Sequence, residues 1–427
     1  MDVREPPAKM SRARRGLVLL LLSAVAATSL HAGAAVAWNQ WRGPARDGSV
    51  PGDDWPADLG GLERQWRIEL GKGYPGPIVA GDRVFVVETV DSKSVAVRAL
   101  DRRSGETIWE RSWPGRGSVP FFAQANGDWV RSTPAYDGRA LYVGDMSEVL
   151  VALDGESGKE IWRVDLPARF GTDVPDFGFA SSPLLLGDHL YAQAANSLVK
   201  LDKRTGATVW RALEDPGRIQ QSGAFSSPVA AVIDGVPQIV TLTREALYGV
   251  NPETGGVFWS QPVPSFRGMH IMTPVVVDGA IFTSPYKQRS FLYDVRRDGS
   301  KMLVEQAWEN KSTGYMSSPV VIDGHLYLHL GNQRFECIEL ATGKSRWRSR
   351  PFGKYWSMGY QADKILALDS NGTLLLIRAN PQAFELLDSR EVSEQETWGH
   401  IAVSGDQIFV RELKAISAFR WRPSTRE

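Results

Sequence analysis

The stretch ALDGESGKEIW, residues 152–162, combines an apolar strand end, a turn rich in Asp and Gly, and a second run that closes on tryptophan. This pattern is typical of two β-strands joined by a tight turn. The phrase recurs along most of the chain, at intervals of 43, 53, 48, 49, 49 and 39 residues between successive closing tryptophans. A period of about 40–50 residues predicts β-propeller blades. The closing tryptophans are Trp66, Trp109, Trp162, Trp210, Trp259, Trp308 and Trp347.

Each repeat has the same internal order. An apolar run opens it, often after Ser-Ser-Pro as at 181–183, and a two-residue turn such as Asp137-Gly138 follows. Asp/Gly turns tolerate positive φ and match the twist of a β-hairpin. Two further β-rich runs and the tryptophan phrase complete the unit. The order predicts four strands per unit and almost no helix, because no segment shows a sustained helical period.

Counting the units predicts a closed ring of eight blades. The eighth unit supplies only three strands, whereas residues 62–70 form an unassigned strand ahead of the first unit. Pairing that strand with the last blade would leave no open sheet edge. Tandem β-sandwich domains are the alternative, but they do not predict one extra strand at the start and one missing at the end. The eight units open near Pro77, Pro134, Pro183, Pro228, Pro274, Pro319, Gly359 and Ile401.

The first residues have the pattern of an export signal. Basic residues precede an apolar run from Leu17 to Leu30, and small residues end at Ala37. We therefore expect a signal peptide at 1–37 with cleavage after Ala37, an N-terminal extension at 38–61 and the propeller at 62–427. A retained membrane anchor is the open alternative, although the run is shorter than the roughly 20 apolar residues that span a bilayer. The expected location is the periplasm or cell envelope, with no membrane-spanning segment after cleavage.

Charge and cysteine content narrow the function. Lys plus Arg and Asp plus Glu are 49 each, and residues 1–37 remove five basic and two acidic residues, so residues 38–427 carry 44 minus 47, or −3. This balance gives no indication of nucleic-acid binding. Cys337 is the only cysteine, so no internal disulfide can form, and it is predicted to be a buried small apolar residue. We expect a monomer.

The tryptophan phrase resembles the repeat of pyrroloquinoline-quinone (PQQ)-like propellers. It is carried by residues 99–109, 152–162 and 201–210, with looser copies at 250–259 and 338–347. The segment WRGPARDG, residues 41–48, is similar to the opening of many bacterial exported repeat proteins of this group. These exported repeat proteins are in turn similar to the propeller lipoprotein of outer-membrane assembly. The resemblance covers essentially the whole chain from about Trp38.

The resemblance implies three function classes: quinone-dependent oxidation of alcohols or sugars, scaffolding of the outer-membrane barrel-assembly machinery, and other exported binding roles. The quinone enzymes of this group carry a disulfide between adjacent cysteines, and Glu, Asn and Asp around a calcium ion. One cysteine cannot form that disulfide. We therefore expect a non-catalytic binding or scaffold module of the cell envelope, without catalytic residues, metal or cofactor. A PQQ- and calcium-dependent oxidoreductase is the alternative.

Any binding site is expected in the loops that lead into the first strand of each blade, because loops on a rigid scaffold carry function. These loops hold many aromatic residues. They either plug the channel and seal the seams between blades, or form a funnel for an envelope protein or a small planar or sugar-like ligand. The candidate rim residues are Tyr74, Arg131, Phe179, Phe225, His270, Tyr315, Trp356, Trp398 and His400. Longer loops add Trp113, Phe121, Phe122, Trp129, Phe170 and Phe177.

Overall fold

The computed structural model describes residues 37–91, 93–115, 119–121, 124, 127–215 and 223–423. The chain divides into two units, Met1–Ala34 and Ala35–Glu427, and every described residue belongs to the second. The predicted signal peptide therefore lies outside the described residues, apart from Ala37. Within the described part of the chain, no helix is long and apolar enough to cross a membrane.

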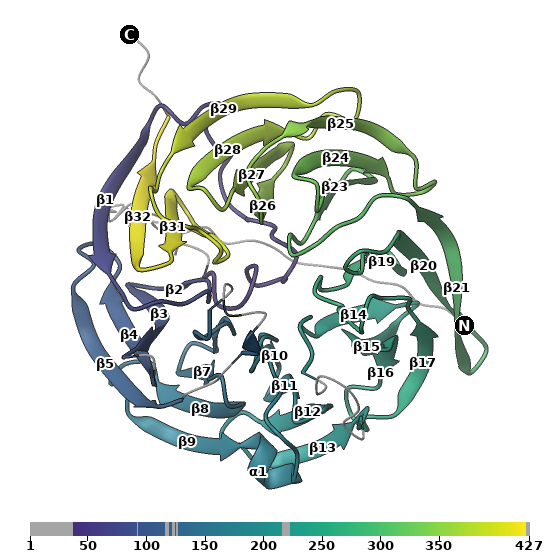
Figure 1. Ribbon diagram of the computed structural model, residues 1–427, viewed down its shortest axis with the longest axis horizontal. Coiled ribbons are helices and arrows are strands. Elements are labelled where there is room, and N and C mark those ends of the chain that lie inside the picture. The colour runs from purple at the N-terminus through teal and green to yellow at the C-terminus, as the bar shows by residue number, and fades with distance from the viewer. Residues whose placement is uncertain are drawn as a thin grey trace, which may run out of the picture. The chain divides into compact units, whose positions relative to one another are not determined.

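The described residues form eight antiparallel sheets of four strands each, arranged as a ring (Figure 1). The one α-helix among them is α1 (Leu166–Phe170), which follows the last strand of the second blade. The first strand of each blade lies nearest the ring axis and the fourth lies at the rim (Figure 1). The prediction of an all-β, eight-bladed propeller is confirmed.

The first four blades begin where the Pro-containing repeats predicted. Blade 1 contains β2 (Ile78–Ala80), β3 (Arg83–Val90), β4 (Ser94–Asp101) and β5 (Thr107–Pro114). Blade 2 contains β6 (Ala135–Tyr136), β7 (Ala140–Gly144), β8 (Val149–Asp154) and β9 (Glu160–Asp165). Blade 3 contains β10 (Leu184–Leu186), β11 (His189–Ala194), β12 (Ser197–Asp202) and β13 (Thr208–Ala212). Blade 4 contains β14 (Val229–Ile233), β15 (Val236–Leu242), β16 (Ala246–Val250) and β17 (Val257–Pro262).

The remaining blades keep the same order. Blade 5 contains β18 (Val275–Val277), β19 (Ala280–Thr283), β20 (Ser290–Asp298) and β21 (Lys301–Asn310). Blade 6 contains β22 (Val320–Ile322), β23 (His325–His329), β24 (Arg334–Glu339) and β25 (Ser345–Pro351). Blade 7 contains β26 (Ser357–Gln361), β27 (Lys364–Leu368), β28 (Thr373–Arg378) and β29 (Glu385–Glu391). Blade 8 contains β30 (Ala402–Ser404), β31 (Gln407–Glu412), β32 (Ala415–Trp421) and β1 (Leu62–Glu69).

The tryptophan phrase fastens each blade to its neighbour. In the phrase at 152–162, the Asp154 carboxylate accepts hydrogen bonds from the backbone and hydroxyl of Ser157 and so closes the turn. Gly158 has a φ of +66°, and a Cβ there would lie 2.5 Å from the ring of Trp109 in the preceding blade. The Trp109 indole in turn donates to the Gly155 carbonyl at 3.0 Å. The phrase is therefore an inter-blade contact, which explains its repetition without any role in catalysis.

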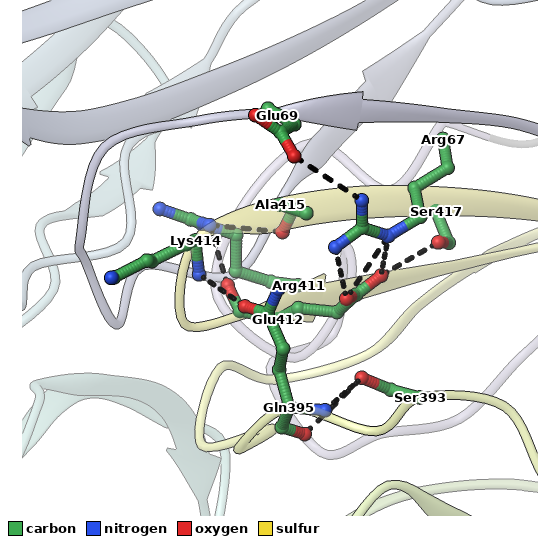
Figure 2. A network of polar contacts seen from close by, with 9 residues as sticks. All are labelled: Arg67, Glu69, Ser393, Gln395, Arg411, Glu412, Lys414, Ala415 and Ser417. Carbon is green, nitrogen blue, oxygen red and sulfur yellow. Dashed lines mark hydrogen bonds and ion pairs between the residues drawn. The ribbon is translucent and has the colours of Figure 1, made fainter.

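The ring closes through strand β1. This strand pairs antiparallel with β32, from Leu62 opposite Trp421 to Glu69 opposite Ala415. Arg67 on β1 binds the Glu412 carboxylate with Nε and Nη2, at 3.2 and 2.9 Å (Figure 2). The Ser417 hydroxyl also donates to Glu412, whose side chain is 2% exposed. The predicted closure by an N-terminal strand is thus confirmed, and an ion pair between the partly exposed Arg67 and the buried Glu412 joins β1 to the rest of the blade.

The core lies in layers between adjacent blades. One layer packs Phe85 and Val97 of blade 1 against Leu141 and Val151 of blade 2. Cys337 on β24 is fully buried in the layer between blades 6 and 7. The thiol is therefore a packed apolar group, as the alternating pattern around it predicted, and burial raises its pKa to about 11.

Residues 38–61, predicted as an N-terminal extension, lie against the first strands of several blades. Trp38 forms a β-bridge with Val79 of blade 1, and Ser49 forms one with Tyr360 of blade 7. The purple segment near the ring axis in Figure 1 belongs to this part of the chain. The propeller's own N-terminal segment therefore crosses the region that a propeller otherwise leaves as a channel.

Candidate functional site

A cavity of about 220 Å³ lies beside this segment, on the face where loops lead into the first strands. We call it the axial cavity. Seven of the eight blades contribute to its lining, and Trp41 of the N-terminal segment also lines it. Six of the nine rim residues predicted from the sequence belong to the lining: Tyr74, Arg131, Phe225, Tyr315, Trp398 and His400.

The other three predicted rim residues lie away from the cavity. Phe179 and Trp356 are each 1% exposed and pack in the cores between blades. His270 is 2% exposed, whereas its neighbours Met269 and Ile271 line the cavity. Successive side chains of an extended segment point to opposite sides. A prediction that is wrong by one residue therefore names a buried side chain in place of one that lines the cavity.

Aromatic rings form one wall of the axial cavity. The Tyr74 ring stacks on Trp398, with centroids 4.9 Å apart and planes 17° apart. Trp398 also meets the edge of Tyr355 at 4.4 Å. The Arg131 guanidinium lies 5.7 Å from the Tyr74 centroid, and burial lowers the pKa of Arg131. Partly exposed rings with a cation beside them form a surface suited to a flat or apolar group.

Phe177 and Phe225 form a second aromatic contact in the cavity lining, with centroids 5.3 Å apart. Phe177 belongs to the long loop into blade 3, and it lines the cavity in place of the predicted Phe179. Arg244 lies 5.3 Å from the Phe225 ring. Both aromatic groups in the lining therefore have an adjacent guanidinium, Arg131 beside Tyr74 and Arg244 beside Phe225.

The N-terminal segment is held by two buried arginines. Arg46 donates to the carbonyls of Pro183 and Ser182 at 2.8 and 3.1 Å, and Arg42 donates to Pro319 at 2.7 Å. Both guanidinium groups lie close to the Trp41 ring, with distances to its centroid of 5.5 Å for Arg42 and 5.4 Å for Arg46. Burial lowers the pKa of Arg42 to about 10 and that of Arg46 to about 9. These groups stay charged at neutral pH and tie the segment to blades 3 and 6.

Two buried imidazoles, His270 and His329, and the partly exposed His400 lie near the same face of the ring. Burial, with a contribution from Arg42, lowers the pKa of His400 to about 3. Burial also lowers the pKa values of His270 and His329 to about 4. His400 meets the edge of Trp41 at 5.2 Å between centroids. All three rings are therefore neutral at pH 7, and none is paired with a carboxylate in the cavity lining.

Comparison with known proteins places the chain in a family. Residues 92–349 match the family model described as outer membrane protein assembly factor BamB. The chain belongs to this family. The predicted resemblance to PQQ-like repeat propellers is confirmed, because the matched range spans the repeats from blade 1 to blade 6 of the BamB-family chain.

Relatives of this BamB-family chain carry two kinds of name. It is 23% identical to the outer membrane protein assembly factor BamB of Yersinia pestis over 315 residues, which is 69% of this chain and 73% of that protein. It is 31% identical to the polyvinylalcohol dehydrogenase of a Sphingopyxis species over 209 residues, 44% of this chain and 30% of that protein. The crystal structure of BamB from Moraxella catarrhalis has a TM-score of 0.62 at 14% identity, covering 86% of this chain and 99% of that one. The last comparison shows a shared fold.

The axial cavity of this BamB-family chain does not fit PQQ with calcium. Calcium takes about six to eight oxygen ligands, usually including carboxylates. No Asp or Glu lines the cavity, and the described residues contain no group of three or more potential metal ligands among His, Cys, Asp and Glu. Cys337 is the chain's single cysteine and is buried in the core, so a disulfide between adjacent cysteines cannot form here. We therefore derive no chemical step through the quinone.

Sequence reasoning missed Trp41 as a lining residue. The residues that hold it, Arg42 and Arg46, lie in a Gly- and Pro-containing segment without a strand pattern. The detectable signal was an aromatic residue with two nearby arginines ahead of the first blade. It could not be placed at the ring axis because its partners are backbone carbonyls more than 100 residues away.

Proposed function

We propose that this chain is an exported, non-catalytic propeller that binds another protein of the cell envelope and acts there as a scaffold. The match to the BamB family over residues 92–349 supports this proposal. So does the likeness to an outer membrane protein assembly factor across most of both chains. The loops that lead into the first strands, with the axial cavity among them, form the proposed binding face.

The observation that carries the proposal is the segment that occupies the ring axis. Trp41, Arg42 and Arg46 are all less than 8% exposed, so they use the space in which a small molecule could be enclosed. The remaining cavity of about 220 Å³ is below the about 300–1,000 Å³ typical of sites that enclose a drug-sized ligand. It suits one or two side chains of a partner protein better than a whole cofactor.

The second candidate is a PQQ-dependent oxidoreductase of alcohols or sugars. The identity of 31% to a polyvinylalcohol dehydrogenase over 209 residues favours it. The lining of the axial cavity opposes it, since the residues there include an arginine and a neutral histidine but no carboxylate. We therefore place it second.

Affinity capture from envelope extract tests the binding role. We expect immobilised residues 38–427 to retain a protein that the Tyr74→Ala/Trp398→Ala variant retains at least about tenfold less, because aromatic residues dominate binding energy at protein interfaces. The matched control is Ile108→Ala/Val257→Ala, which alters exposed apolar residues on fourth strands at the ring's rim. Retention of the same proteins by all three chains, or of none by the unaltered chain, would count against the proposed function.

A further inference from the structure

A second cavity, of about 500 Å³, lies on the same face at blades 5, 6 and 7. We call it the lateral cleft. Its walls are the loop between β19 and β20, the loop from β21 into blade 6, the loop between β23 and β24, and the loop into blade 7. These elements are neighbours in the green part of the ring (Figure 1). Tyr315 lines both the lateral cleft and the axial cavity, so the two are adjacent.

The lateral cleft has a strong excess of positive charge. Lys287, Lys311, Lys354 and Arg348 line it, and no Asp or Glu does. Arg348 is neutralised by the fully buried Glu336, with Nε 2.7 Å from the carboxylate oxygen. The three lysines are exposed, and within the described part of the chain none has a carboxylate within 4.0 Å. Three cations thus remain for a ligand, in a chain whose residues 38–427 carry a net charge of −3.

Tyrosines supply flat faces between these cations. Tyr286 and Tyr315 have ring centroids 4.7 Å apart, and Tyr315 and Tyr355 have centroids 5.6 Å apart. All three rings are half-buried, so each presents an edge or a face to the cleft. Lys287 lies 5.2 Å from the Tyr286 centroid, which holds the ammonium group over the wall of the cleft. Tyrosine is enriched at protein-binding hot spots, and the lysines beside these rings add charge complementarity to an acidic ligand.

We propose that the lateral cleft binds an acidic, extended peptide segment of the envelope partner, an inference that rests on the proposed binding function and specifies the chemistry of that partner. Asp and Glu side chains of the segment pair with Lys287, Lys311 and Lys354, while its apolar or aromatic side chains lie on the three tyrosines. The cleft volume of about 500 Å³ is within the about 300–1,000 Å³ range of enclosing sites. A concave wall with recessed tyrosines matches a chain segment better than a flat anionic membrane.

The test uses a random glutamate–tyrosine copolymer, fluorescently labelled, as the acidic probe and residues 38–427 as the protein. We expect saturable binding by fluorescence anisotropy that weakens with added salt, because exposed charges are screened within about 8 Å at physiological ionic strength. The variant Lys287→Gln/Lys311→Gln/Lys354→Gln is expected to bind about tenfold more weakly, since each exposed ion pair contributes modestly and three are lost together. Tyr286→Ala is expected to weaken binding without changing its salt dependence.

A matched variant changes three lysines on the opposite face. Lys159, Lys301 and Lys344 are exposed. Lys159 and Lys344 lie in turns between third and fourth strands, and Lys301 is the first residue of the fourth strand β21. The variant Lys159→Gln/Lys301→Gln/Lys344→Gln has the same net charge as the cleft variant. It is expected to bind the copolymer like the unaltered chain.

Equal losses of copolymer affinity in both triple variants, or a loss of affinity in neither, would overturn the assignment of the lateral cleft as the binding site. Binding to phosphatidylglycerol vesicles that requires Lys287, Lys311 and Lys354, without copolymer binding, would overturn it in favour of a membrane. Each of these results leaves the envelope-capture result unaffected.

Discussion

Deleting residues 38–70 is expected to abolish cooperative folding of the whole ring. The deletion removes β1, so β32 loses its partner along the register from Leu62 to Glu69. It also removes the segment that crosses the ring axis and binds blades 3 and 6 through Arg46 and Arg42. The last blade would be left with three strands and an open edge next to blade 1.

The size of the effect follows from the apolar side chains that leave with the segment. Eight of them are less than 9% exposed, and burying a large apolar side chain contributes about 1.5–3 kcal/mol. Their sum is as large as or larger than the about 5–15 kcal/mol that stabilises a typical native protein. The eight residues are Trp38, Trp41, Val50, Trp55, Leu59, Leu62, Trp66 and Leu70.

Thermal unfolding followed by circular dichroism measures this effect. We expect a single cooperative transition for residues 38–427 and none for residues 71–427. Co-expression of residues 38–70 as a separate polypeptide is the control, and it is expected to restore a transition because β1 can pair with β32 in trans. A cooperative transition of residues 71–427 at the unaltered melting temperature would contradict the closure of the ring by β1.

Acid is expected to destabilise the propeller between about pH 6.5 and pH 4. His400, His270 and His329 have pKa values of about 3, 4 and 4 when folded, against 6.5 for an exposed histidine. Below pH 6.5 the unfolded chain therefore binds protons that the folded chain does not, and stability falls. Each histidine is expected to contribute a loss of roughly 2 kcal/mol between neutral pH and about pH 5.

Glu148 acts in the opposite direction. Burial raises its pKa from 4.5 to about 7, so the folded chain takes up a proton first and gains stability as the pH falls through this range. The carboxylate accepts a hydrogen bond from the backbone of Ala195 at 2.8 Å and joins blades 2 and 3. The gain between neutral pH and about pH 5 is roughly 2 kcal/mol, which offsets about one histidine.

Urea unfolding at neutral pH and at about pH 5 separates these contributions. The difference in unfolding free energy between the two pH values is expected to shrink by roughly 2 kcal/mol in His400→Gln and to grow by a similar amount in Glu148→Gln. The partly exposed His189→Gln, at the start of β11, serves as the matched His-to-Gln control. An unaltered difference in His400→Gln would show that this imidazole titrates normally.

The fold could be predicted from the sequence because its determinants are local and repeated. The Asp154 turn, the glycine beside the preceding tryptophan and the indole bond to the next blade recur with the repeat period. Each copy of the phrase indicates the same contact between blades, so the number of blades can be counted even though one copy is degenerate. Counting the strands also predicted that the N-terminal strand β1 completes the last blade.

The candidate site could be predicted only in part, because its contacts are neither local nor repeated. Tyr74 and Trp398 lie more than 300 residues apart in sequence, and their stacking follows from ring closure. His270 occupies the same position in its repeat as residues that line the cavity in other repeats. In blade 5, however, the adjacent residues Met269 and Ile271 line the cavity and the His270 side chain is buried. The path of Trp41 across the axis depends on carbonyl acceptors in blades 3 and 6, which no side-chain pattern reveals.

The central claim is that this propeller is a binding module whose own N-terminal segment lies at the ring axis. Two assays of residues 38–427 test it: isothermal titration with PQQ and calcium, and then dye reduction with alcohols and sugars as substrates. The account predicts no saturable cofactor binding and no dye reduction above that of the Trp41→Ala variant, because Trp41 and the buried arginines occupy the axis and no carboxylate lines the cavity. Stoichiometric binding of the quinone with substrate-dependent dye reduction would contradict it and establish the oxidoreductase.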